Sequence, residues 1–171
     1  PDYIEACYNL GVTLQDLGQL DAAVKSYEQA LAVKPSYAEA HNNLGVTLKE
    51  LGKHDAAVKS YEQALAVNPS YAEAHNNLGV TLKELDQLTD AVKSFEKAVA
   101  LKPDYAEAYR NRGHVLFGLK RLDEALASYE STIALDPNLD FILGNSLHTK
   151  MQLCIWDDLP NRVDELTKKI N

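Results

Sequence analysis

Proline recurs at one fixed interval along this chain, and that spacing limits what the sequence can fold into. Five of the six prolines share the interval, namely Pro1, Pro35, Pro69, Pro103 and Pro137. A repeated unit this short cannot bury its apolar face alone, so successive units must stack on one another. The sequence therefore predicts a solenoid in which each unit packs only on its neighbours.

The repeated units are close copies with helical spacing. Residues 35–51 and 69–85 are identical, and so are residues 21–33 and 55–67. Apolar residues recur three or four positions apart, as Leu44, Leu48 and Leu51 do, which is typical of helices and not of strands. Each unit is expected to hold two helices, near 4–17 and 21–34, 38–51 and 55–68, 72–85 and 89–102, and 106–119 and 123–136.

Capping signals indicate where these helices begin and end. Ser36 is followed by Glu39 and Ser70 by Glu73, with Asp2 and Glu5 and Asp104 and Glu107 at the same spacing, which is that of an N-terminal capping box. Gly18 and Gly52 suit the left-handed conformation that ends a first helix. The prolines stop each second helix.

Composition excludes several classes of function. The formal net charge is -8 and the pI is near 5.1, which disfavours nucleic acid as a partner because phosphate binding needs clustered Lys and Arg. No apolar run approaches the length needed to cross a bilayer, so no membrane partner is expected. The chain opens at Pro1 in register with the repeat, so we expect a piece of a longer protein.

The two cysteines and five histidines show no metal or redox pattern. Cys7 and Cys154 lie near opposite ends, which disfavours a disulfide and favours reduced thiols in a cytoplasmic protein. His41 and His75 recur in an apolar column, where packing with a hydrogen bond is favoured over metal binding. We find no phosphate loop, catalytic constellation or cluster of metal ligands, so the chain is expected to be no enzyme and to hold no cofactor or metal.

The repeat resembles the tetratricopeptide repeat family over residues 1–136. The residues that match its signature in the second unit are His41, Leu44, Gly45, Leu48, Ala57, Tyr61, Ala64 and Pro69. The resemblance implies an all-α, right-handed superhelical solenoid of antiparallel helix pairs. It implies four full repeats, 1–34, 35–68, 69–102 and 103–136, followed by a degenerate repeat with capping helices at 137–171.

In this family the first helix of each pair lines a concave groove, and one column of that face is asparagine. It comprises Asn9, Asn43, Asn77, Asn111 and Asn145. A side-chain amide can pair with both the N–H and the C=O of an extended peptide. The alternative is that asparagine only tolerates a solvated helix face, but its poor helix propensity favours peptide binding as the reason for its recurrence.

Neighbouring columns change in chemistry along the predicted groove. The fourth unit carries Arg110, His114 and Phe117, while Asn42 and Asn76 precede Arg110 in its column. All of these join the Asn column as candidate peptide-binding residues. The acidic column Glu5, Glu39, Glu73 and Glu107 could select basic peptides, but the capping boxes account for it without a ligand, and we favour capping.

The C-terminal segment departs from the repeat. Its residues Asn145, His148, Cys154, Trp156, Asp158 and Arg162 resemble the passage where the repeats of O-linked N-acetylglucosamine transferases and SPINDLY-type relatives meet the catalytic domain. The sequence therefore predicts a scaffold that binds an extended peptide as the recognition part of such a protein. The alternative is an adaptor that binds a partner helix and has no link to sugar transfer. Weak end-to-end self-association is also expected.

Overall fold

The computed structural model describes residues 2–139, 141–156 and 167. Within this part of the chain there are nine α-helices and no strand, as the repeat pattern predicted. The chain forms two compact units, Pro1–Leu101 and Lys102–Asn171. Each unit is described below by itself.

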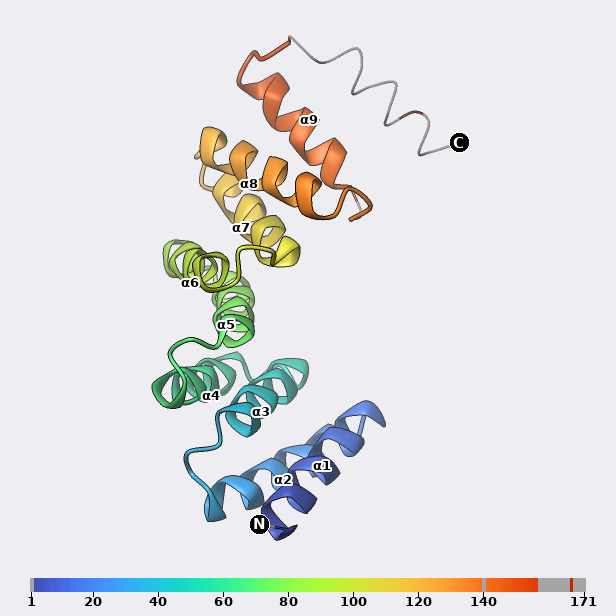
Figure 1. Cartoon of the computed structure of the whole chain (residues 1–171), viewed down its shortest axis with the longest axis vertical. Helices are drawn as coiled ribbons and strands as arrows, with labels where there is room; N and C mark the ends of the chain where they lie inside the picture. Colours follow the sequence, from blue (N-terminus) through green and yellow to red (C-terminus); the bar gives the residue numbers. More distant parts are fainter. Residues whose placement is uncertain (1, 140, 157–166, 168–171) are drawn as a thin grey trace. The chain divides into compact units, whose positions relative to one another are not determined.

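The first unit consists of three helix pairs (Figure 1). The pairs are α1 (Asp2–Asp16) with α2 (Leu20–Val33), α3 (Ala38–Glu50) with α4 (His54–Val67), and α5 (Ala72–Glu84) with α6 (Leu88–Leu101). The two helices of a pair lie side by side, and the second helix of one pair contacts the first helix of the next. The predicted helices agree with these bounds to within two positions.

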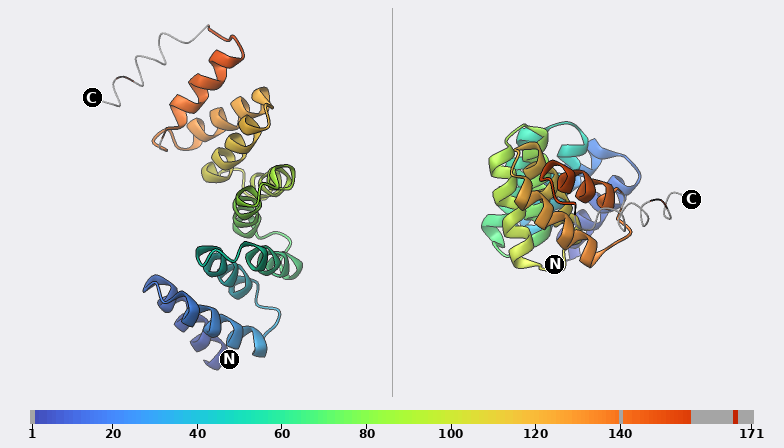
Figure 2. Two further views of the ribbon diagram at one scale, coloured as in Figure 1. Left: turned by 180° about the vertical axis from the view of Figure 1, so that it is seen from behind. Right: turned by 90° about the horizontal axis from the view of Figure 1, so that it is seen from above.

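The second unit contains one complete pair and a further helix (Figure 2). Helix α7 (Ala106–Gly118) packs against α8 (Leu122–Leu135), and α9 (Ile142–Gln152) packs against α8. Helix α9 lies in the segment that the sequence predicts to cap the repeats. The second helix of that predicted cap would fall on residues outside the described ones.

A glycine lies against an aromatic ring in each complete pair. A Cβ atom on Gly11, Gly45, Gly79 or Gly113 would be 2.6–2.7 Å from ring carbons of Tyr27, Tyr61, Phe95 and Tyr129 respectively. All four rings are buried. The glycine therefore sets the distance between the two helices, because any side chain there would push the ring away.

The residue two positions after the end of each first helix has a left-handed backbone, whether or not it is glycine. Gly18 and Gly52 have φ of 70° and 72°, as predicted. At the same interval along the chain, Asp86, Lys120 and Cys154 have φ of 59°, 61° and 57°. Since Cys154 falls in this series, α9 ends as the first helix of a repeat does.

The predicted capping boxes of α3, α5 and α7 are wrong. The N-cap residues of α3, α5 and α7 are Tyr37, Tyr71 and Tyr105, and none of them makes a side-chain capping hydrogen bond. Ser36 lies one position too early to be the N-cap. The glutamates fall in the first turn, where a carboxylate interacts favourably with the helix dipole.

Candidate functional site

Side-chain amides in the first unit form a hydrogen-bonded chain across its first helices. The Asn77 Nδ2 donates to Asn42 Oδ1 at 3.0 Å, and Asn42 Nδ2 donates to Asn43 Oδ1 at 3.2 Å. The Asn43 Nδ2 then donates to the Tyr8 hydroxyl at 2.9 Å. The chain of amides thus links α5, α3 and α1, so it joins neighbouring repeats as well as lining a face.

The exposure of the asparagines differs from the prediction. Asn9 is exposed, and Asn43 and Asn77 are half-buried. Asn111 of the second unit is buried, although the sequence places it in the predicted peptide-binding column. Asn42 and Asn76 are also buried, at 6% and 3% exposure. For Asn42 the burial follows from helix packing, because its amide meets Asn77 of the next repeat.

Threonines one helical turn after the Asn column stabilise the same face. The hydroxyls of Thr13, Thr47 and Thr81 donate to the carbonyl oxygens of Asn9, Asn43 and Asn77 at 2.9–3.0 Å. These bonds engage the main chain of the asparagines and leave their amides to contact other helices. Thr149 repeats the bond to Asn145 O in the second unit, at 2.7 Å.

Tyrosines that the sequence analysis did not select also lie on this face. The rings of Tyr8 and Tyr37 have centroids 5.0 Å apart. Burial raises the pKa of Tyr37, and it raises the pKa of Tyr71 to about 12, with the nearby Glu39 carboxylate adding to both shifts. Tyr3, Tyr37, Tyr71 and Tyr105 recur at the interval of the prolines, and this period is the signal that could have revealed them.

In the second unit the structure brings together the predicted polar and aromatic residues of α7 and α9. The Asn145 Nδ2 lies 2.9 Å from His114 Nε2. The rings of Phe117 and His148 have centroids 5.4 Å apart. Arg110 is half-buried, and its Nε is buried without a hydrogen-bond partner among the described residues.

An open apolar groove of about 570 Å³ lies in the first unit beside α4, α5 and α6. Its lining includes Leu65, Leu78 and Leu101, with Lys97 at the same groove. His75 also lines it, is only 6% exposed and has its Nε2 3.1 Å from the carbonyl oxygen of Pro69. The predicted packing of His75 with a hydrogen bond is therefore confirmed.

The described part of the chain contains no cluster of metal ligands, no membrane-spanning helix and no disulfide. Its His, Cys, Asp and Glu residues form no group of three or more that could hold a metal ion. Its helices include none that is long and apolar enough to span a bilayer. Cys7 and Cys154 are free thiols, buried and exposed respectively.

The repeat identifies the family. A family model described as TPR repeat matches residues 14–52, 47–86 and 81–120, and the tetratricopeptide repeat model matches residues 106–139. Together they cover most of the chain, which therefore belongs to the tetratricopeptide repeat family. The comparison with curated proteins found no match.

Solved structures share the fold. The MamA protein has a TM-score of 0.88 at 23% identity, over 98% of this chain and 92% of that one. YrrB, described as a TPR protein with an unusual peptide-binding site, has a TM-score of 0.78 at 24% identity, over 92% and 81% of the two chains. PilF of Pseudomonas aeruginosa has a TM-score of 0.84 at 22% identity, over 98% and 76%. At these identities the likeness shows the fold alone.

Proposed function

We propose that this chain is a non-catalytic protein-interaction scaffold that holds an extended peptide on the face formed by α1, α3 and α5. The observation that carries the proposal is the chain of amides from Asn77 through Asn42 and Asn43 to Tyr8. A side-chain amide has two N–H groups, and each of these bonds uses one of them. Asn43 and Asn77, which are half-buried, keep a second N–H for the backbone of a ligand.

The hydrogen-bonded amides also favour tight binding for a physical reason. Because the helices hold each amide in place before the ligand arrives, less side-chain entropy is lost on binding. The exposed Asn9 extends the column on α1. We further propose that Arg110, His114, Phe117 and Asn145 form a peptide-contacting face within the second unit. Asn76 of the first unit and Asn111 of the second are buried, so they would act by support and not by direct contact.

A second candidate function is the binding of a partner helix, and the groove beside α4, α5 and α6 favours it. Its leucines offer the apolar contacts that an amphipathic helix needs. Neither candidate requires chemistry by this chain. A parent glycosyltransferase rests only on the likeness of residues 145–162, of which Asp158 and Arg162 lie outside the described residues. Sequencing the gene beyond the codon for Asn171 tests that link.

One experiment separates the two candidates. A peptide selected by phage display against the whole chain is titrated by fluorescence polarisation into the parent protein and two variants. Asn43→Ala removes an amide from the α1, α3 and α5 face, and Ala100→Arg fills the groove at an exposed position. We expect Asn43→Ala to weaken binding about 2- to 10-fold and Ala100→Arg to leave it unchanged.

The same titration gives the contrary outcomes. Loss of binding only in Ala100→Arg would favour the helix-binding groove. If neither variant changes the affinity, both candidate sites are wrong. Melting curves of each variant ensure that the titration is made on folded protein, because Asn43→Ala also removes the bond to Tyr8.

A further inference from the structure

The acidic column of the first unit places negative charge beside the recurring tyrosines. Glu5 and Glu39 of this column are both exposed. Glu39 lies in the first turn of α3, two positions after the N-cap residue Tyr37. Its carboxylate adds to the raised pKa of Tyr8, Tyr37 and Tyr71, for which burial is the main cause. Residues 1–101 hold fourteen Asp and Glu against eight Lys and Arg, so the surrounding unit is acidic as well.

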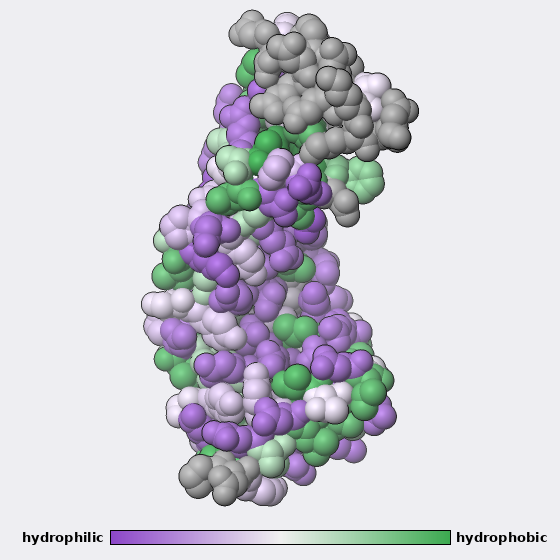
Figure 3. Space-filling view, turned by 45° about the vertical axis from the view of Figure 1, so that its right-hand side comes forward, coloured by the Kyte–Doolittle hydropathy of each residue, from purple (hydrophilic) through white to green (hydrophobic). Residues whose placement is uncertain are grey.

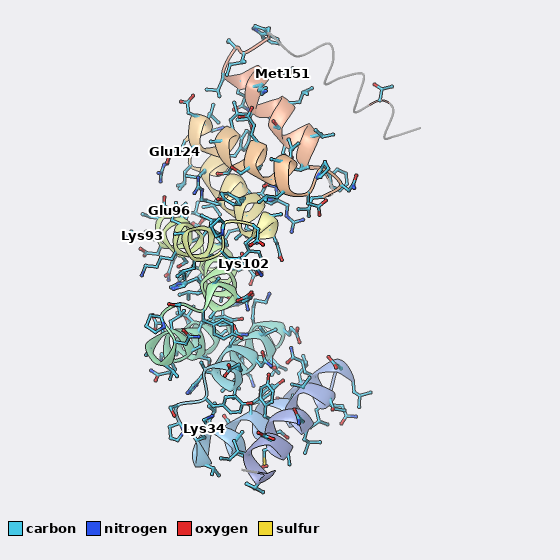
Figure 4. All side chains as sticks on the ribbon, viewed as in Figure 1. Lys34, Lys93, Glu96, Lys102, Glu124 and Met151 are labelled. Atoms are coloured by element: carbon cyan, nitrogen blue, oxygen red, sulfur yellow. The ribbon has the colours of Figure 1, made fainter. Side chains whose placement is uncertain are left out.

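The protein already places cations on the recurring tyrosines. Lys34, the residue after α2, has its Nζ 4.5 Å from the centroid of the Tyr37 ring. Within the second unit, Lys102 has its Nζ 4.8 Å from the Tyr105 ring. Figure 4 labels both lysines at the ends of the helices that precede them. A cation over a tyrosine face gains electrostatic attraction from the ring quadrupole.

Tyr71 occupies the same position in the repeat but has no lysine before it. The residue that takes the place of Lys34 in the next repeat is Asn68, whose Oδ1 accepts a hydrogen bond from Ser70 N at 3.1 Å. The backbone is the same at both sites, with φ and ψ of -127° and 84° at Lys34 and -130° and 90° at Asn68. Among the described residues, Tyr71 is thus a half-buried ring without the cation that Tyr37 and Tyr105 carry.

We propose that Tyr71 and Glu39 form a subsite for a lysine or arginine side chain of the bound peptide. The ligand cation takes the place over the Tyr71 ring that Lys34 takes over Tyr37, and the Glu39 carboxylate supplies the opposite charge. The subsite rests on the proposed function, since the peptide must lie along α1, α3 and α5. It adds a preference for basic segments that the amides, which bind backbone, cannot supply.

The test blocks the subsite with a lysine at the position that Lys34 occupies in the preceding repeat. The variant Asn68→Lys supplies Tyr71 with the internal cation seen at Tyr37, and Gln63→Lys adds the same charge at an exposed position on α4. The probes are two fluorescein-labelled synthetic peptides of alternating lysine and serine, one with free lysines and one with acetylated lysines. Binding to the full chain is measured by fluorescence polarisation at fixed ionic strength.

We expect the free-lysine peptide to bind the parent about 3- to 30-fold more tightly than the acetylated one. Asn68→Lys should abolish that advantage and Gln63→Lys should keep most of it. Tyr71→Phe, which retains a π face, should bind like the parent, while Tyr71→Leu should behave like Asn68→Lys.

Four outcomes would overturn the subsite. They are equal binding of the two peptides, no binding of the lysine peptide, equal losses in Asn68→Lys and Gln63→Lys, and an unchanged preference for free lysine in Asn68→Lys. None of these outcomes contradicts the proposed function, because the phage-selected peptide and the Asn43→Ala variant test the proposed function independently. If the phage-selected peptide binds the amide face but Asn68→Lys does not reduce the preference for the free-lysine peptide, the proposed scaffold is supported and the basic subsite is wrong.

Discussion

Gly45 lies so close to Tyr61 that a Cβ atom on the glycine would be 2.6 Å from Cε1 of the ring. The Tyr61 side chain is fully buried, so it has no free space in which to move away. We expect Gly45→Ala to lower the free energy of unfolding by about 1–3 kcal/mol, as overpacking a core does.

Gly118→Ala is the matched control. A Cβ at Gly118 would have nothing within 4 Å, and this residue ends α7 without a positive φ. Its replacement should leave stability unchanged or raise it slightly. Thermal melting of both variants measures the difference. Equal melting temperatures for Gly45→Ala and the parent would mean that the helices separate at little cost.

Lys49→Gln should stabilise the protein. In the first repeat, Gln15 Oε1 accepts a hydrogen bond from the Tyr27 hydroxyl at 3.0 Å. Lys49 takes the place of Gln15 in the second repeat and its ammonium group cannot accept a hydrogen bond, while the Tyr61 hydroxyl is buried without a partner among the described residues.

A glutamine there should satisfy the Tyr61 hydroxyl and raise the free energy of unfolding by about 0.5–1.5 kcal/mol. Chemical denaturation measures the change. Lys83→Gln is the control, because the corresponding ring in the third repeat, Phe95, has no hydroxyl. A similar gain in both variants would show that removal of a lysine charge is the cause.

Acidification should destabilise the first unit through His75. Burial, with the nearby Lys97 charge, lowers the pKa of His75 from its ordinary value of 6.5, although the Pro69 carbonyl opposes the shift. The fold thus favours the neutral ring, so this contribution to stability is complete above pH 6.5 and is lost as the pH falls below it. Denaturation midpoints at about pH 7.5 and 5.5, on either side of the ordinary pKa, should differ more for the parent than for His75→Gln. An equal pH dependence would exclude His75 as the cause.

Self-association should run through an apolar stripe on α1. Tyr3, Leu10 and Leu17 are spaced by seven positions and are 62%, 51% and 65% exposed. Figure 3 shows hydrophobic patches near the lower end of the view, in the region of α1 and α2. We expect sedimentation velocity to show weak association that rises with concentration and is lost in Leu10→Lys with Leu17→Lys. A parent that stays monomeric at every concentration would contradict this.

The sequence was sufficient for the helices because their determinants are local or periodic. The fixed interval of the prolines and the small residues at Gly45 and Ala57 can be read directly from the sequence. The role of the asparagines could not be predicted in this way, because the bonds from Asn43 to Tyr8 and from Asn77 to Asn42 join residues 35 positions apart. Comparing equivalent positions of successive repeats finds like residues, whereas the contact that buries an amide connects one column to the next.

The capping prediction failed for a different physical reason. The spacing of Ser36 and Glu39 is that of a capping box, but Tyr37 stands at the N-cap position with φ of -105° and ψ of 90°. The extended backbone there belongs to the turn after Pro35 and directs the tyrosine toward its neighbours. The packing of Tyr37 on Tyr8 therefore replaces a local hydrogen bond that the sequence alone had favoured.

The identity of residues 35–51 and 69–85, which contain the first helices of the second and third pairs, has a consequence for how such a protein can change length. Excision of residues 35–68 would join Lys34 to Pro69 and recreate the junction of Lys34 with Pro35, since residues 69–85 repeat residues 35–51. Helix α2 would then meet α5, whose sequence is that of α3. Recombination within the duplicated stretch of the gene can therefore remove or add a whole repeat, and the reach of the binding face, without creating a junction that the protein does not already contain.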